Sequence, residues 1–319
     1  MKNLDVITFG EAMAMFMAEE PGELHQVIHY TRELAGAETN FAIGMAKLGF
    51  QSGWISKVGE DAFGKFIKER LKQKNVNIDH VLTTPDYPTG FQIKSKVFAG
   101  DPEVQYFRKG SAASQLSVED ADQEYVDSAE HLHMTGIPLA LASSTREFAM
   151  HVLKLIKSSG KSVSFDPNLR PSLWNSEEEM IRVTNEAAVQ TDYVLPGMEE
   201  GEILTGRTTP EAIADFYLEQ GVKGVVVKLG DEGAYFKTSS EEGYVNGLEV
   251  SQVVDTVGAG DGFAVGLVSG LLDGITLKDA VFRGNAIGAL AVQSPGDNDG
   301  YPTRDALETY IKPYLKGAK

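Results

Sequence analysis

A glycine-rich segment near the C-terminal end of the chain combines an acidic side chain with backbone N–H groups that could bind an anion. Residues 254–262 read VDTVGAGDG, in which we expect a strand end, a glycine-rich turn and the start of an apolar helix. Glycines let a backbone approach a ligand closely, and the unpaired N–H groups at a helix start attract anions. Asp261 would repel a phosphate, but it could accept the proton of a hydroxyl that attacks one. The spacing alone equally allows Asp261 to be a simple helix cap.

Two other interpretations of the glycine-rich segments fail on detail. A dinucleotide-binding fingerprint needs a glycine where Phe263 stands, and it normally belongs to the first βαβ unit of a domain. Residues 59–66 nearly match a phosphate-binding loop of the Walker type. The match is incomplete because Phe66 occupies the position where a Ser or Thr hydroxyl would hold magnesium.

A second group of polar residues follows the buried strand that we expect at residues 162–166. Asp166, Asn168 and Arg170 lie at the end of this strand or just beyond it. In a parallel sheet this is the carboxyl edge, where α/β proteins bind their ligands. The same residue types also make ordinary turns, so this segment alone does not establish a site.

A tyrosine and an arginine stand two positions apart on a strand that we expect at residues 104–108, namely Tyr106 and Arg108. Side chains alternate along a strand, so both should face the same side. A guanidinium holds a carboxylate through two charge-assisted hydrogen bonds, whereas a neutral sugar has no need of it. The pair therefore indicates an acidic substrate, with a surface cation–π contact as the alternative.

The elements that must position these residues alternate between short β-type runs and helical patterns. Such alternation is typical of a mostly parallel sheet covered by helices on both faces. The expected strands are residues 4–9, 53–58, 131–135, 162–166, 193–196 and 224–229, and the expected helices are residues 38–48, 62–74, 144–158, 177–190 and 262–272.

Two segments break this alternation. Residues 11–34 lack a clear helical pattern, and residues 88–110 contain two β-type runs, 90–98 and 104–108, joined by a turn at Gly100-Asp101-Pro102. We expect the two segments to pair into a small β lid over the ligand crevice. No linker or repeat divides the chain, so residues 1–319 should form one domain into which lid segments at about 11–34 and 88–110 are inserted.

Composition excludes several classes of function. The 319 residues are 42% hydrophobic and 24% charged, which is ordinary for a globular chain. The formal net charge of −17 argues against nucleic acid or an anionic membrane surface as a partner, so any anionic ligand must be met by local cations or N–H groups. The chain has no cysteine, which excludes disulfides and thiolate metal sites and favours the cytoplasm. No segment resembles a membrane span or a targeting signal.

Several motifs distributed along almost the whole chain occur together with the glycine-rich segment. They are AGAETN at residues 35–40, VGEDAFG at residues 58–64 and VVVKLGDEGA at residues 225–234. In this order they resemble the signatures of the ribokinase-type, or PfkB, carbohydrate kinases. The resemblance implies a ribokinase-like three-layer α/β/α fold with a small β-strand lid, and the ATP-dependent phosphorylation of an alcohol.

The resemblance also assigns roles within the glycine-rich segment. Asp261 would be the catalytic base. The backbone N–H groups of Gly258, Ala259 and Gly260 would form the anion hole for the transferred phosphoryl group. Catalysis of this kind depends mainly on positioning and on stabilising charge.

The nucleotide and its metal would be held by residues on several strand ends. The resemblance assigns the nucleotide to Asn168, Lys228, Gly230, Gly233 and Asn285, with Asn285 on the adenine side. Magnesium should accompany ATP, and Glu200 would contact it indirectly through water. Many members of that family have Asn where this chain has Gly197, so this chain lacks the amide that helps to organise the magnesium water shell in those members. The resemblance leaves open whether a monovalent cation such as K⁺ is also needed.

The substrate residues resemble the acid-sugar branch of the family, which phosphorylates 2-keto-3-deoxygluconate. In that branch the tyrosine and arginine of the lid motif bind the keto-acid, which implies the same roles for Tyr106 and Arg108. Further contacts would come from Gly36, Ala37, Asn40 and Arg170. The alternatives are a fructokinase-like or other neutral-sugar kinase and, from another class, an ATP-binding sensor without catalysis. An exposed lid edge also predicts a homo-oligomer.

Overall fold

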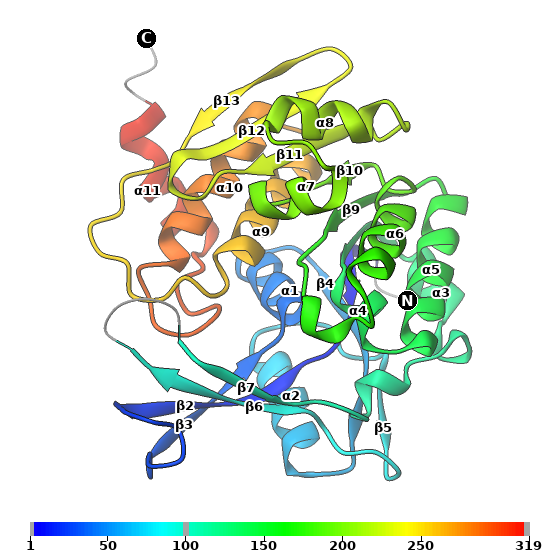
Figure 1. The fold of residues 1–319 in the computed structure, drawn as a ribbon, viewed down its shortest axis with the longest axis vertical. Helices are drawn as coiled ribbons and strands as arrows, with labels where there is room; N and C mark the ends of the chain where they lie inside the picture. The colour runs from blue at the N-terminus through cyan, green and yellow to red at the C-terminus, as the bar shows by residue number, and fades with distance from the viewer. Residues whose placement is uncertain (1–2, 98–101, 316–319) are drawn as a thin grey trace.

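Two β-sheets of different size make up the framework of the molecule (Figure 1), and the computed structural model describes residues 3–97 and 102–315 of it. The larger sheet has nine strands in the order β13–β12–β11–β10–β9–β8–β1–β4–β5. Along this order, each pair of neighbouring strands from β11 through to β5 is parallel. β12 and β13 extend the sheet beyond β11 as antiparallel strands. The strands are β1 (Leu4–Phe9), β4 (Ser52–Gly59), β5 (Val81–Thr84), β8 (Ala129–Thr135), β9 (Ser162–Asp166), β10 (Tyr193–Val194), β11 (Gly224–Lys228), β12 (Gly233–Thr238) and β13 (Glu242–Asn246).

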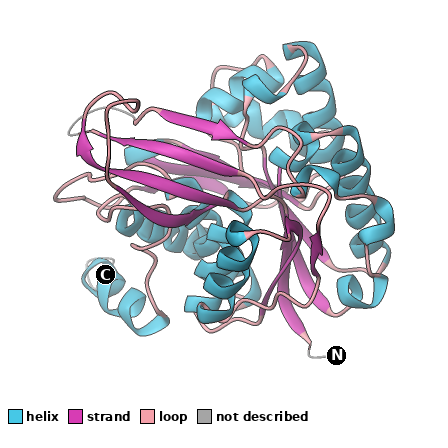
Figure 2. Ribbon diagram, turned by 90° about the horizontal axis from the view of Figure 1, so that it is seen from below, coloured by secondary structure: helices cyan, strands magenta, loops and turns pink. Residues whose placement is uncertain are grey.

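Helices cover both faces of this sheet, as Figure 2 shows. Because strand side chains alternate, Val225 and Val227 of β11 pack into one buried cluster and Val226 packs into the other. The first cluster includes residues of α3 (Gln123–Asp127), α4 (Ile137–Leu141), α5 (Ser143–Ser158), α6 (Glu177–Ala188) and α8 (Pro210–Leu218). The second includes residues of α1 (Ala37–Lys47), α9 (Ala259–Leu272), α10 (Leu277–Ala291) and α11 (Arg304–Leu315). Two further helices are α2 (Ala62–Gln73) and α7 (Met198–Thr205), and short 3₁₀ turns occur at Ala113–Gln115, Val118–Asp120, Pro171–Leu173 and Gly230–Glu232.

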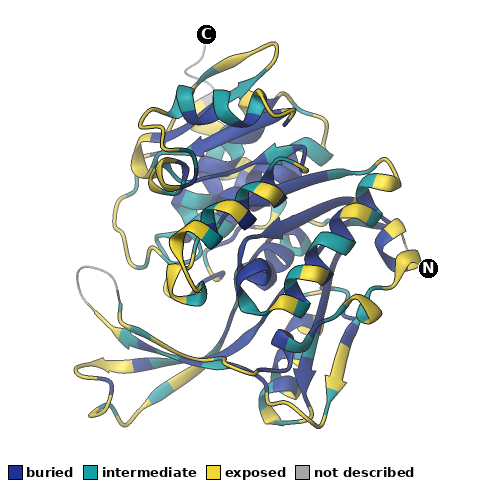
Figure 3. Ribbon diagram, turned by 45° about the vertical axis from the view of Figure 1, so that its right-hand side comes forward, coloured by how far each residue is buried: buried dark blue, intermediate teal, exposed yellow. Residues whose placement is uncertain are grey.

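The expected three-layer α/β/α architecture is therefore confirmed. Figure 3 shows the inner strands of the large sheet buried between helices whose outer faces are exposed, whereas the edge strands β5 and β13 are largely exposed. β1 and β9 have the bounds expected from the sequence. Among the described residues, none of the helices is both long enough and apolar enough to cross a membrane.

The lid is a four-stranded sheet in the order β3–β2–β6–β7. It pairs β2 (Met13–Pro21) with β3 (Tyr30–Ala35) and, in parallel, with β6 (Phe91–Lys96), which in turn pairs with β7 (Val104–Phe107). The predicted pairing of the two irregular segments is confirmed, whereas the predicted turn at residues 100–102 lies largely outside the described residues. Phe91 and Phe107 stack at 4.5 Å on the face of the lid that also meets Phe63 of α2.

One expectation for the glycine-rich segment is wrong. Residues 252–256 form no strand, and α9 begins at Ala259 rather than at residue 262. The N–H groups of Val254 and Asp255 instead donate to the carbonyl of Val292, at 2.7 and 3.3 Å. The segment is therefore held by the C-terminal end of α10, and the glycines belong to the first turn of a helix.

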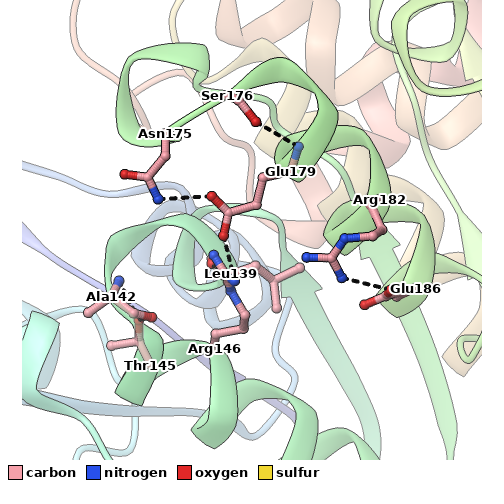
Figure 4. A network of polar contacts seen from close by, with 9 residues as sticks. All are labelled: Leu139, Ala142, Thr145, Arg146, Asn175, Ser176, Glu179, Arg182 and Glu186. Carbon is pink, nitrogen blue, oxygen red and sulfur yellow. Dashed lines mark hydrogen bonds and ion pairs between the residues drawn. The ribbon is translucent and has the colours of Figure 1, made fainter.

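A polar network holds the connection from β9 to α6 against α5 (Figure 4). The guanidinium of Arg146 donates to the carbonyl of Leu139 at 2.9 Å and to the carboxylate of Glu179 at 2.9 Å. It also lies 5.2 Å from the ring centroid of Trp174, and Ser176 caps α6 by accepting from the N–H of Glu179 at 3.1 Å. This arrangement holds Trp174 and the start of α6, at the far end of the connection that carries Asn168 and Arg170.

Candidate active site

A cavity of about 630 Å³ lies between the carboxyl edge of the large sheet and the lid. β1 and β8 are neighbours in the large sheet. The next strand of that sheet after β1 is β4 on one side, and the next after β8 is β9 on the other side. Open α/β sheets bind their ligands at such a switch point. Thirteen residues singled out from the sequence line this cavity: Gly36, Ala37, Asn40, Tyr106, Arg108, Asp166, Asn168, Arg170, Glu200, Lys228, Gly258, Gly260 and Asp261. Residues far apart in the chain are thus brought to one site.

The N-terminus of α9 points its first N–H groups toward this cavity. Gly258 is the N-cap residue, with φ +83° and no side-chain cap. In the described part of the chain the N–H groups of Gly258 and Gly260 have no hydrogen-bond partner, whereas that of Ala259 donates to the carbonyl of Thr256 at 3.3 Å. The available donors are therefore the two glycines, and Ala259 does not line the cavity.

Asp261 is the third residue of α9, and it does not cap the helix. Its carboxylate instead accepts from the amide of Asn40 at 2.9 Å and from the amide of Asn168 at 3.4 Å. Loss of hydration raises the pKa of Asp261, although Asn40, Arg170, Lys228 and Asn168 act in the opposite direction. A carboxylate with a raised pKa is a better proton acceptor, which suits a general base.

Lys228 ends β11 beside the anion-binding turn. Its ammonium contacts a carboxylate oxygen of Asp166 at 2.6 Å, and it lies 3.8 Å from the point where a Cβ on Gly260 would be. Burial raises the pKa of Asp166 to about 6, because the loss of hydration outweighs the nearby ammonium. Lys228 therefore brings a positive charge to the N-terminus of α9 at Gly260.

Glu200 joins two strand ends. One of its carboxylate oxygens accepts from the N–H of Leu169 at 2.7 Å and the other from the N–H of Gly197 at 2.8 Å. No group of three or more acidic or histidine side chains in the described part of the chain could hold a metal ion. This donor set suits Mg²⁺ that is bound mainly by phosphates and water, since Mg²⁺ rarely uses an all-protein cage. Glu200 could then accept hydrogen bonds from its water shell.

The lid contributes Arg108 and Tyr106. Arg108 donates through Nε to Glu11 at 2.6 Å and lies 5.8 Å from the ring centroid of Tyr106. Among the residues that the structure describes, the two terminal nitrogens of Arg108 have no hydrogen-bond partner. Tyr106 is 49% exposed. The guanidinium is therefore held in place on one side and available to a ligand on the other.

A buried lysine that the sequence reasoning missed connects the lid to both sides of the α9 N-terminus. The ammonium of Lys94 lies 2.5 Å from a carboxylate oxygen of Asp255 and 3.5 Å from one of Asp297. The three side chains are 4%, 10% and 5% exposed. The alternation of side chains along a strand was the sequence signal that could have identified Lys94. Gln92 and Lys94, two positions apart on β6, line the cavity as Tyr106 does from β7.

Glu38 is a second site residue that sequence reasoning missed, although it lies in the same motif as Asn40. Its carboxyl group is fully buried and accepts from the hydroxyl of Thr135, and its other oxygen has no partner among the described residues. Burial raises the pKa of Glu38 to about 7. Glu38 is therefore partly protonated at neutral pH beside the cavity.

Three residues assigned to the nucleotide lie beyond Lys228 and do not line the cavity. Gly230 and Gly233 have φ of +64° and +104°, and a Cβ on Gly233 would lie 2.1 Å from the carbonyl oxygen of Val245. Asn285 donates to the carbonyls of Val245 and Asn246, at 2.9 and 3.1 Å. Gly233 and Asn285 thus both contact β13, and Gly230 lies in the turn that leads into β12.

Comparison with known proteins agrees with this geometry. Residues 3–304 match the model of the pfkB family carbohydrate kinases. A 2-dehydro-3-deoxygluconokinase of Bacillus subtilis (strain 168) is 54% identical over 309 residues, which cover 97% of this chain and 95% of that protein. The crystal structure of a PfkB protein from Polaromonas sp. JS666 has a TM-score of 0.89 at 48% identity and covers 96% of this chain and 99% of that one.

A putative ribokinase II from E. coli, crystallised in complex with ATP and Mg²⁺, has a TM-score of 0.90 at 29% identity. The match covers 97% of this chain and 99% of that one. The fold, the ordered motifs and the full-length similarity lead to one conclusion: the chain belongs to the pfkB family of carbohydrate kinases.

Proposed function

We propose that this kinase transfers the terminal phosphoryl group of ATP to the terminal hydroxyl of 2-keto-3-deoxygluconate (2-dehydro-3-deoxygluconate), giving 2-keto-3-deoxy-6-phosphogluconate and ADP. One observation carries the proposal. Asp261, the free N–H groups at the start of α9 and the Arg108–Tyr106 pair border the same cavity. The first two suit phosphoryl transfer to an alcohol, and the third suits a carboxylate. The B. subtilis relative, named for this activity, supports the choice of substrate.

The proposed reaction assigns a separate task to each group. Asp261 accepts the proton of the sugar hydroxyl as the hydroxyl oxygen bonds to phosphorus and the bond to the ADP oxygen breaks. The N–H groups of Gly258 and Gly260, together with Lys228, stabilise the charge on the transferred group. Asn168 and Arg170 lie between the sugar and the phosphates. Magnesium neutralises the triphosphate when bound, and Glu200 contacts its hydration shell.

The nucleotide extends, in this proposal, from Lys228 along the β11–β12 turn. Gly230, around whose Cβ position no atom lies within 4 Å, allows its close approach. Gly233 lets β13 pack against this turn, and Asn285 supports the adenine side through the carbonyls that it holds. Sugar and nucleotide then meet at Asp261. A cytoplasmic location, a homo-oligomeric state and a requirement for a monovalent cation such as K⁺ stay predictions from the sequence.

A panel of acceptors tests the substrate directly. ADP release, measured with a coupled assay, should be fastest with 2-keto-3-deoxygluconate and far slower with fructose, ribose or adenosine. Mass spectrometry should find one added phosphate on the keto-acid. Equal or faster turnover of fructose would favour the neutral-sugar alternative, and no turnover with ATP still bound would favour the sensor alternative.

Arg108→Gln tests the contact with the carboxylate. Glutamine can still donate to Glu11 but removes the charge, and a charge-assisted hydrogen bond is worth about 1.5–3 kcal/mol. We therefore expect the KM for the keto-acid to rise roughly 10- to 100-fold, with the KM for ATP nearly unchanged. Steady-state kinetics with each substrate varied in turn would measure both constants.

Lys109→Gln is the matched control for this variant. Lys109 is the next residue, is exposed and does not line the cavity, so the same loss of charge should leave both constants near those of the parent enzyme. A similar rise in KM for the two variants would mean that Arg108 acts only through the general electrostatic field.

A further inference from the structure

The amide of Asn40 has a direction that matters for Asp261. Its Nδ2 donates to Asp261 Oδ2 at 2.9 Å. A carboxamide turned by half a rotation would present its oxygen instead, and two oxygen acceptors repel unless one of them carries a proton. The direction of the Asn40 amide therefore decides whether the ionised form of Asp261 is stabilised.

Asn298 contacts the opposite end of the same amide. Its Nδ2 donates to Asn40 Oδ1 at 2.9 Å, so that the nitrogen of Asn40 is left to face Asp261. Asn298 is 8% exposed and Asn40 is 2% exposed, so water competes little for either amide. The two amides form a head-to-tail relay that runs from Asn298 through Asn40 to Asp261.

The segment that carries Asn298 is itself anchored. The ammonium of Lys47 donates to the carbonyls of Asn298, Asp299 and Tyr301 at 2.9, 3.4 and 3.1 Å. The hydroxyl of Tyr301 donates to the carbonyl of Gly258 at 2.6 Å. One segment is thus tied to α1 and to the start of α9, which carry Asn40 and Asp261 respectively.

We propose that Asn298 is a positioning residue that holds the amide of Asn40 with its NH₂ group toward Asp261, so that Asp261 serves as proton acceptor. This rests on the proposed role of Asp261 as the base. Asn298 itself does not line the cavity, so it acts through Asn40 rather than on the substrate.

The inference carries a pH dependence with a defined sign. Activity needs ionised Asp261 and falls as the pH drops through its pKa, which lack of hydration already raises. Losing the Asn40 donor would raise the pKa of Asp261 further and move the acid limb of the pH profile to higher pH. The other charged or titratable groups around Asp261 are the cations Arg170 and Lys228 and the acids Glu38, Asp166, Asp297 and Tyr301. They are common to all variants compared below.

Asn298→Asp tests the proposal because it replaces the donor with an acceptor of the same size. Asn40 should then turn its NH₂ group toward residue 298 and its oxygen toward Asp261. We expect the acid limb of the kcat profile to move up by about one pH unit or more, which is a tenfold or greater loss of kcat at pH values below the midpoint of the parent enzyme. The KM for ATP should change less than twofold.

Two companion variants separate amide direction from charge and packing. Asn298→Ala removes the donor without adding an acceptor, so the amide of Asn40 is no longer held in one direction, and the acid limb should move up by clearly less than in Asn298→Asp. Thr303→Asp adds the same negative charge on an exposed residue of the same segment and keeps a side chain that can cap α11. It should leave the limb in place.

A measurement without turnover separates this inference from the proposed function. The carboxyl carbon of Asp261 can be titrated by NMR in ¹³C-labelled protein, with Asp261→Asn to assign the signal. A parent enzyme that does not phosphorylate the keto-acid, together with a raised titration midpoint of Asp261 in Asn298→Asp, would refute the proposed substrate and support the proposed role of Asn298. An unchanged midpoint in Asn298→Asp, or an equal rise in Asn298→Ala or Thr303→Asp, would overturn the relay.

Lys47→Met keeps the inference testable if Asn298→Asp does not fold. It releases the anchored segment and should raise the Asp261 midpoint by a smaller amount in the same direction. Lys72→Met, which removes an equal charge from the exposed surface of α2, should not. A midpoint unaffected by Lys47→Met would then count against the relay.

Discussion

The Asp261→Asn variant should phosphorylate its sugar about 10²–10⁴ times more slowly than the parent enzyme, which is the usual contribution of a positioned general base. Asparagine fills the same space at the third position of α9 but cannot accept the proton. ATP binding should persist, because the free N–H groups of Gly258 and Gly260 remain. Single-turnover kinetics would measure the chemical step, and calorimetry would measure nucleotide binding.

Asp279→Asn is a closely matched control for that experiment. Asp279 is the third residue of the neighbouring helix α10, after the N-cap Thr276, and it is exposed. The same substitution there should leave turnover unchanged. Wild-type turnover in Asp261→Asn, or an equal loss in Asp279→Asn, would refute the assignment of the base.

The second large effect concerns Gly258→Ala. A Cβ at Gly258 would lie 1.9 Å from the carbonyl oxygen of Asp297, and the backbone has φ +83°. Because that contact is impossible, either the start of α9 or the segment at Asp297 must shift, which displaces the N–H groups of the anion hole from the other groups of the site. Removing one donor from an anion hole costs roughly 10²–10³ in kcat, and we expect a loss of that size together with a lower melting temperature.

Gly274→Ala separates the cost of the positive φ from the cost of the close contact with Asp297. Gly274 follows the other end of α9 with φ +70°, but no atom lies within 4 Å of its Cβ position. Alanine there should cost about 1 kcal/mol of folding free energy without affecting kcat. If Gly258→Ala were no worse than Gly274→Ala in kcat, close packing against Asp297 would not be what shapes the anion hole.

Local patterns were sufficient to predict much of the large sheet. β1 and β9 are short, apolar and bounded by polar residues, so their limits follow from composition. β13 was missed because it is a polar edge strand with one buried residue in five. α8 was also missed, although Thr209 before Pro210 is an ordinary helix-start signal.

The candidate site likewise has one part that the sequence predicts and another part that it does not. Asp261 and the glycines of α9 lie in one contiguous motif, so residue types and spacing were enough to single them out. The relay from Asn298 and the ion pair of Lys94 join residues 258 and 161 positions apart. Such contacts depend on how the lid and the C-terminal segment pack, which the local sequence around each residue does not indicate.

The burial of Lys94 has a consequence for how the enzyme responds to its medium. Dissolved ions screen exposed charges over about 8 Å at physiological ionic strength, but they act far less on pairs removed from solvent. The ammonium and its two aspartate partners are at most 10% exposed. The connection between lid and core should therefore hold its strength from dilute buffer to molar salt, even though the acidic exterior of the protein responds strongly to the same change.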